Sequence, residues 1–185
     1  GAVAWEGQLA RALGFGTGHL SLYQLTIEPG TRFAAMAARG DLVPGDPDEG
    51  AALYELTGAM TAAAGLPAYE ISNHARPGEE SRHNLSYWRY QSYAGIGPGA
   101  HGRRGGHATR RHKKPENYLS ALGRNGHGIV EETAILPQDR VVEALLMGLR
   151  LAEGVDIARI AALAGRAPEA LLDWKSVDRL VAQGL

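Results

Sequence analysis

The run from Ser81 to Gly102, SRHNLSYWRYQSYAGIGPGAHG, gathers the side chains with the clearest chemical potential in this sequence. A neutral imidazole such as that of His83 can bind a transition metal, haem iron included. The flat rings of Tyr87 and Trp88 could stack on a planar ligand or enclose it, so the combination suits a porphyrin. A structural interpretation stays open, because tryptophan and tyrosine are mostly core residues and His83 with Asn84 could satisfy buried backbone groups.

The second half of this run is the glycine-rich turn GIGPGAHG, Gly95 to Gly102. Glycines let the backbone approach a ligand closely or take positive φ, and the amides of such a turn can bind an anionic group. The spacing does not fit a dinucleotide-binding fingerprint, and no acidic ribose reader follows it. A tight turn between a strand and a loop would explain the same residues.

A basic segment, RRGGHATRRHKKPENYL, follows the turn. Its arginines and lysines could clamp propionates or phosphates, although a solvated surface run is the simpler interpretation. The histidines here do not recur at a metal-ligand spacing. Because the segment lacks periodicity, we expect residues 103–135 to form a basic linker loop.

Composition limits the functions that this chain can have. It has 185 residues, of which 44% are hydrophobic, enough for one domain with a core or two small ones. With 19 basic and 20 acidic residues it is not expected to bind nucleic acid. No long apolar run or signal peptide is evident, so we expect a cytoplasmic protein without a transmembrane segment. The chain contains no cysteine, which excludes disulfides, thiolate catalysis and cysteine-ligated clusters within it.

The elements that must position these residues follow an α/β order. A helix is expected over 2–13, a strand over 19–27 that is apolar on both faces, a helix capped by Asp46 and stopped by Gly65, and a strand over 66–72. Helix, strand, helix and strand in this order predict parallel winding with right-handed crossovers.

The composition shifts at Leu136 towards short amphipathic helices. The first would be capped by Asp139 and would carry Val142, Leu145, Leu146 and Leu149 on one face. Two more are expected from about Asp156 and about Pro168. We therefore predict a small helical domain over 136–185, of helix-turn-helix or winged-helix type and cut before any wing. The missing initiator methionine and the abrupt end predict a piece of a longer protein.

Five blocks carry a resemblance to a known family: HLSLYQLTIEPGT, LPAYEISNHARPG, HNLSYW, YAGIGPGAHG and EALLMGLRLAEGVD, in this order. Together they closely resemble the HemW family, radical S-adenosylmethionine proteins related to oxygen-independent coproporphyrinogen III oxidase and regarded as haem chaperones. The resemblance implies a longer parent with an N-terminal CxxxCxxC loop for a 4Fe–4S cluster and S-adenosylmethionine at the top of a partial (β/α)6 barrel. The fold class expected here is α/β: the end of that barrel with a joining segment (1–102), the linker, and a truncated winged-helix-like domain.

The resemblance also implies roles for individual residues. The family's proposed haem contact is the histidine of HNxxYW, here His83, with Asn84, Tyr87 and Trp88 completing the block. Weaker candidates for positions near a cofactor are Tyr23 and Gln24, at the carboxyl end of the last barrel strand, and Ile96, Gly97, Gly99 and His101 in the glycine-rich turn.

The function implied is a haem chaperone that transfers haem to haem-requiring proteins, including acceptors at the cytoplasmic membrane face. The alternative is a coproporphyrinogen III oxidase-like radical enzyme, in which His83 would line a porphyrinogen pocket. Whether the parent is an enzyme stays open, and this chain alone should be inactive because it lacks the cluster cysteines. A DNA-binding helix-turn-helix is disfavoured, since EALLDWKSVDRLVAQGL is not notably basic.

Overall fold

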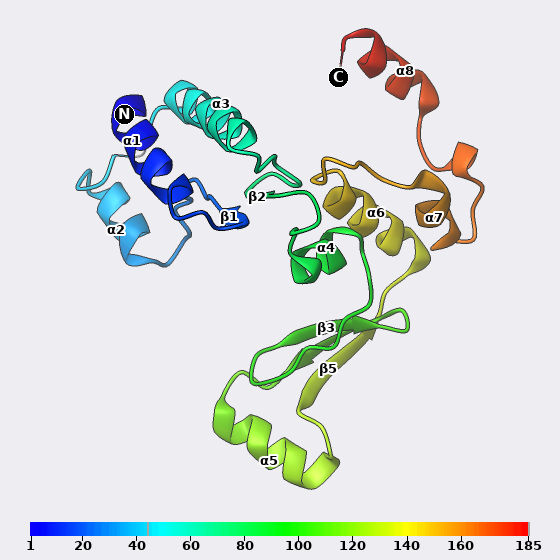
Figure 1. Cartoon of the computed structure of the whole chain (residues 1–185). Coiled ribbons are helices and arrows are strands. Elements are labelled where there is room, and N and C mark those ends of the chain that lie inside the picture. Colours follow the sequence, from blue (N-terminus) through cyan, green and yellow to red (C-terminus); the bar gives the residue numbers. More distant parts are fainter. Residues whose placement is uncertain (44, 185) are drawn as a thin grey trace. The chain divides into compact units, whose positions relative to one another are not determined.

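The computed structural model describes residues 1–43 and 45–184, which form two compact units dividing between Ser81 and Arg82 (Figure 1). This division falls inside the 1–102 segment that we expected to form one domain. Among the described residues, no helix has both the length and the apolar character needed to span a membrane.

The first unit is built mainly from two packed helices. Its elements are α1 (Ala2–Leu13), β1 (His19–Ser21), α2 (Arg32–Ala38), α3 (Pro47–Ala63) and β2 (Asn73–Ala75). The Asp46 side chain accepts from the amide of Asp48 at the start of α3, as its capping role predicted. The fully buried side chains are Leu9 on α1 and Thr61 on α3, and Thr61 donates its hydroxyl back to the Thr57 carbonyl.

The strand expected over 19–27 is shortened to β1, and the strand expected over 66–72 is not formed, because β2 begins just after that range. The two observed strands pair antiparallel rather than parallel. His19 lies opposite Ala75 and Ser21 opposite Asn73. A strand extends only as far as a neighbour supplies hydrogen bonds, and the described residues give β1 one neighbour, β2. The apolar runs 22–27 and 66–72 therefore lie outside the named strands.

The second unit combines a small sheet with helices. Its elements are α4 (Arg82–Trp88), β3 (His101–Arg104), β4 (His107–Arg111), α5 (Pro115–Asn125), β5 (Ile129–Ala134), α6 (Pro137–Gly148), α7 (Ile157–Ala162), the 3₁₀ helix η1 (Pro168–Ala170) and α8 (Trp174–Ala182). The three strands pair antiparallel in the order β3-β4-β5. Figure 1 shows this sheet with α5 at one end of it.

The expectation of a loop over 103–135 was wrong, because the segment supplies most of this sheet and α5. Gly105 and Gly106, both at positive φ, form the turn between β3 and β4. Pro115 stands at the start of α5, and Gly126 ends it with φ at 73°. These are local signals for a hairpin and a helix that the run of basic charge obscured.

The helices expected after Leu136 are present, and the Asp156 side chain caps α7 by accepting from the Arg159 amide. Asp139 lies inside the first turn of α6 rather than at its cap. The buried face of α6 also differs from the predicted one: Val141, Ala144 and Gly148 are buried. Three of the expected apolar residues are exposed: Val142 at 54%, Leu146 at 67% and Leu149 at 68%.

The position of α7 explains this rotation of α6. A side chain at Gly148 would collide with Val155, so the glycine lets the segment before α7 lie directly against α6. The core of the second unit forms around this contact, from Tyr90, Val141, Ala144 and Ile160.

Candidate ligand site on helix α4

The helix α4 carries His83 and Tyr87 one turn apart, so their side chains lie on the same face. The Tyr87 hydroxyl and His83 Nε2 are 3.2 Å apart, within hydrogen-bonding distance. Their rings meet edge to face, with centroids 4.8 Å apart and an interplanar angle of 85°. Because His83 is exposed, it is not the buried core histidine of the structural interpretation, and its ring is accessible to a ligand.

A third aromatic ring contacts Tyr87 of this pair. Tyr93, in the segment after α4, meets Tyr87 at a centroid distance of 4.5 Å and an angle of 71°. Edge-to-face contacts of this kind stabilise aromatic pairs beyond their simple burial. His83, Tyr87 and Tyr93 thus form a continuous row of rings, of which the histidine is the exposed end.

Trp88 does not join this row, although the sequence block contains it. No ring contact among the described residues links it to His83. The Arg150 guanidinium lies over the Trp88 ring, 4.7 Å from its centroid. Trp88 also lines a hollow of about 330 Å³ with residues that include Leu151 and Val155. Asn84 is half-buried on α4.

The glycine-rich turn is fixed to the end of strand β4. The Gly99 amide donates to the His112 carbonyl at 2.8 Å, and the Arg111 amide donates to the Ala100 carbonyl at 2.9 Å. Gly97 and Gly99 have φ of 97° and 74°, values that favour glycine.

Two other candidates of this region are exposed: Ile96, at 85%, and His101, on β3. No hydrogen bond or ring contact among the described residues joins either of them to His83.

The candidates in the first unit line a separate cavity. Tyr23 and Gln24 border a space of about 780 Å³, and Gln24 Nε2 donates to the Gly50 carbonyl at 2.7 Å. The same cavity is lined by His74, which sequence reasoning missed even though it stands in one of the five family blocks. Its Nδ1 lies 2.9 Å from the buried hydroxyl of Thr61. Burial lowers the pKa of His74, although the Glu70 carboxylate opposes that shift.

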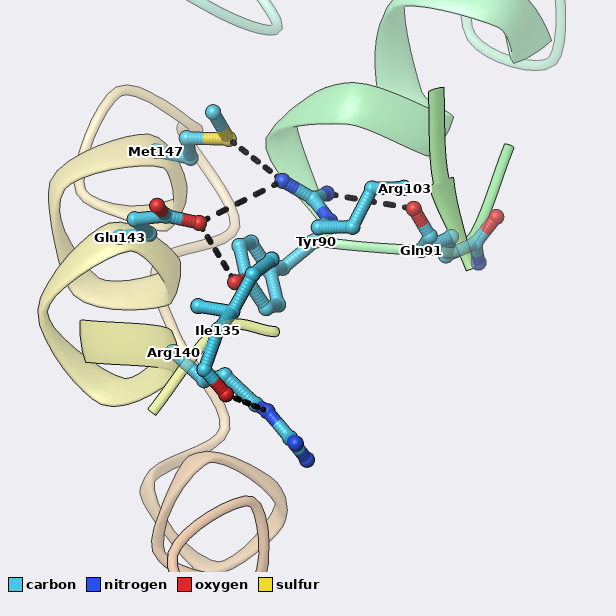
Figure 2. Close-up of polar contacts among 7 residues, drawn as sticks. All are labelled: Tyr90, Gln91, Arg103, Ile135, Arg140, Glu143 and Met147. Carbon is cyan, nitrogen blue, oxygen red and sulfur yellow. Dashed lines mark hydrogen bonds and ion pairs between the residues drawn. The ribbon is translucent and has the colours of Figure 1, made fainter. Parts of the chain in front are cut away.

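A second group that sequence reasoning missed surrounds Arg103 (Figure 2). We assigned this arginine to a solvated basic run, but it is 8% exposed. Its guanidinium carbon lies 3.5 Å from the centroid of Tyr90, a residue with φ at 53°. The Tyr90 hydroxyl donates to Glu143 Oε2 at 2.6 Å. Burial raises the pKa of the Tyr90 phenol, and the bond to Glu143 raises it further.

Metal-binding side chains do not gather in the part of the chain that the structure describes. Within the described residues there is no group of three or more histidine, cysteine, aspartate or glutamate side chains that could hold an ion. The chain has no cysteine, so it offers no thiolate ligand for an iron–sulfur cluster. The residues present therefore do not fit such a cluster.

Comparison with known proteins identifies relatives of this chain. The model of the HemN C-terminal domain matches residues 135–185. "Radical S-adenosyl methionine domain-containing protein 1, mitochondrial" from Mus musculus is 38% identical over 196 residues, covering 98% of this chain and 43% of the relative. "Heme chaperone HemW" from Bacillus subtilis is 33% identical over 166 residues, covering 90% of this chain and 44% of the relative. Over most of its length the chain is similar to heme chaperones of the HemW family, and its C-terminal part matches the HemN C-terminal domain.

A solved structure supports the fold. The coproporphyrinogen III oxidase HemN from Escherichia coli, described as a radical SAM enzyme, matches with a TM-score of 0.60 over 83% of this chain and 38% of its own. At 16% identity this likeness confirms the α/β HemN-like fold and says nothing of activity. The chain spans less than half the length of these relatives.

Proposed function

We propose that this chain contributes the haem contact of a HemW-type haem chaperone, which binds haem and transfers it to haem-requiring proteins. Relatives named heme chaperone HemW support the class of protein. The observation that carries the proposal is the exposed His83 ring, held at one nitrogen by Tyr87. Haem is cargo here, so the site must hold it and also release it.

The hydrogen bond to Tyr87 suggests which nitrogen meets the iron. A neutral imidazole has one N–H donor and one lone pair, and a metal-binding histidine usually donates its other N–H to a neighbouring oxygen. In the binding tautomer, His83 Nε2–H would donate to the Tyr87 hydroxyl oxygen, leaving the Nδ1 lone pair for iron. A single ligand on an exposed helix face suits reversible binding.

The longer protein would carry the remaining parts of the proposal. S-adenosylmethionine and a 4Fe–4S cluster would belong to sequence outside these 185 residues. The acceptors would be haem-requiring proteins, including some at the cytoplasmic membrane face, and we propose the cytoplasm as the site of action. The likeness to HemN favours a second candidate, a coproporphyrinogen III oxidase-like enzyme in which the same histidine lines a porphyrinogen pocket.

A haemin titration followed by absorbance in the Soret region tests the haem contact. We expect a saturable shift for the wild-type chain and a loss of about tenfold or more in affinity for His83→Ala. His107→Ala is a matched control, because His107 is also exposed but lies on β4, in a hydrogen bond to the Gly105 carbonyl. If all three proteins titrate alike, His83 is not the haem contact, and coproporphyrinogen turnover by a longer protein becomes the next assay.

A further inference from the structure

The row of rings that ends at His83 begins at a buried charge. Tyr93 and Arg103 are joined by a pair of backbone hydrogen bonds, Tyr93 amide to Arg103 carbonyl at 2.8 Å and the reverse at 2.9 Å. The Arg103 guanidinium carbon lies 5.5 Å from the Tyr93 ring centroid, within the range of a cation–π contact. From Tyr93 the contacts continue through Tyr87 to His83.

Arg103 is held from several sides, as Figure 2 shows. Its Nη2 donates to the Gln91 carbonyl at 3.2 Å, and its Nη1 lies 3.9 Å from Glu143 Oε2 on α6. The Tyr90 ring covers one face of the guanidinium, and Nη1 also faces Met147 Sδ at 4.0 Å. A guanidinium fixed by a carboxylate, a carbonyl and an aromatic face has little rotational freedom. It therefore provides a rigid support for the Tyr93 ring.

We propose that Arg103 is a positioning residue for the haem contact of His83, acting through Tyr93 and Tyr87. The inference rests on the proposed haem site and adds to it the residues that orient the ligand. Tyr87 has to keep its hydroxyl at His83 Nε2, and the edge-to-face contact with Tyr93 sets the plane of the Tyr87 ring. If Arg103 is removed, the Tyr93 ring loses its charged neighbour and the row can tilt. The imidazole then samples several orientations before it meets iron.

The test is a haemin titration of the 185-residue chain, with circular dichroism to confirm that each variant is folded. Arg103→Gln should raise the dissociation constant for haemin about tenfold, as is usual when the support of a metal ligand is lost. Glu143→Gln is the second variant, because that side chain is 43% exposed and its loss should be tolerated by the fold. Arg110→Gln is the matched control: it breaks an exposed ion pair with Glu131 on the same sheet.

The decisive readout is additivity with Tyr87→Leu. If Arg103 acts through the row of rings, Arg103→Gln should have little further effect in the Tyr87→Leu background. A purely structural arginine would weaken binding by the same factor in both backgrounds, and that result would overturn the proposal. Normal haemin binding by folded Arg103→Gln would also overturn the proposal. If Arg103→Gln does not fold, normal haemin binding by folded Glu143→Gln would overturn it instead.

The His83→Ala variant separates the two failures. If it binds haemin as the wild type does, the proposed function itself fails. If it binds weakly while Arg103→Gln binds normally, only the positioning role is wrong.

Discussion

Removing the Tyr90 hydroxyl should measurably destabilise the second unit. The phenol donates to Glu143 Oε2 at 2.6 Å, and the tyrosine is only 8% exposed. Hydrogen bonds to charged groups typically contribute about 1.5–3 kcal/mol to stability. Because the Glu143 side chain is 43% exposed, water screens part of that interaction, and we expect Tyr90→Phe to cost about 1–2 kcal/mol of unfolding free energy.

Urea unfolding followed by tryptophan fluorescence measures this cost. A Trp5→Phe background leaves Trp88 and Trp174 as the only tryptophans, and both belong to the second unit. Tyr118→Phe is the matched control and should change stability by less than about 0.5 kcal/mol, because the hydroxyl of this half-buried tyrosine on α5 makes no hydrogen bond among the described residues. Equal effects of Tyr90→Phe and Tyr118→Phe would refute the reasoning.

The dependence on pH gives a second check on the same bond. Burial and the Glu143 carboxylate raise the pKa of Tyr90, so the folded state favours the protonated phenol. This contribution is fully present below the unfolded-state pKa of about 10 and is lost as pH rises towards the folded-state value. The stability difference between the wild type and Tyr90→Phe should therefore shrink above pH 10. A difference that stays constant to pH 11 would contradict this assignment.

Two further predictions concern other parts of the chain. Burial lowers the pKa of His74, so its contribution to stability should be complete above pH 6.5, its usual pKa, and be lost as the pH falls below that value. In thermal melts between pH 5 and 8, the difference in melting temperature between wild type and His74→Gln should therefore be smaller at the acid end. Gly95→Ala should lower the free energy of unfolding in urea by about 2 kcal/mol or more, because the new methyl group would collide with the His101 carbonyl. In the control Gly123→Ala, in helix α5, the methyl group meets open space and should stabilise the protein by about 0.5–1 kcal/mol.

Elements with strong local signals were predictable from the sequence. Asp46 caps α3 as expected, the helix expected over 2–13 has these bounds, and α7 begins directly after Asp156. The sheet of the second unit was not predicted, because its turn carries a clear signal in the sequence and its strands do not. The Gly105 and Gly106 turn marks a hairpin, but the flanking strands are rich in charged and polar residues, so they lack the apolar alternation that identifies a strand.

The face of α6 shows a second limit of pattern reading. A hydrophobic stripe tells which residues could be buried, but a helix with apolar residues on two faces is oriented by its neighbours. Here Gly148 determines which face of α6 is buried, because the chain before α7 packs against α6 at the residue that lacks a side chain. A stripe of large apolar residues leaves small residues out, yet Ala144 and Gly148 lie on the buried face.

The buried Arg103 could not have been found from its own surroundings in the sequence. It stands in a basic run, where most arginines are solvated, and its neighbour Arg104 is exposed. Its burial depends on Tyr90, a residue with positive φ that lies just after the end of α4. It also depends on Glu143 of α6, forty residues later in the chain. Contacts between such distant segments are decided by packing, which no local spacing encodes.

The HNxxYW block itself divides once the helix is formed. His83 and Tyr87 stand one turn apart and share a face, whereas Trp88 lies under Arg150 and lines a different hollow. A block that looks like one site in the sequence therefore divides into an exposed ring, on which the proposed haem contact rests, and a tryptophan that packs against Arg150. Substitutions at Trp88 should then act on stability first, and those at His83 on binding alone.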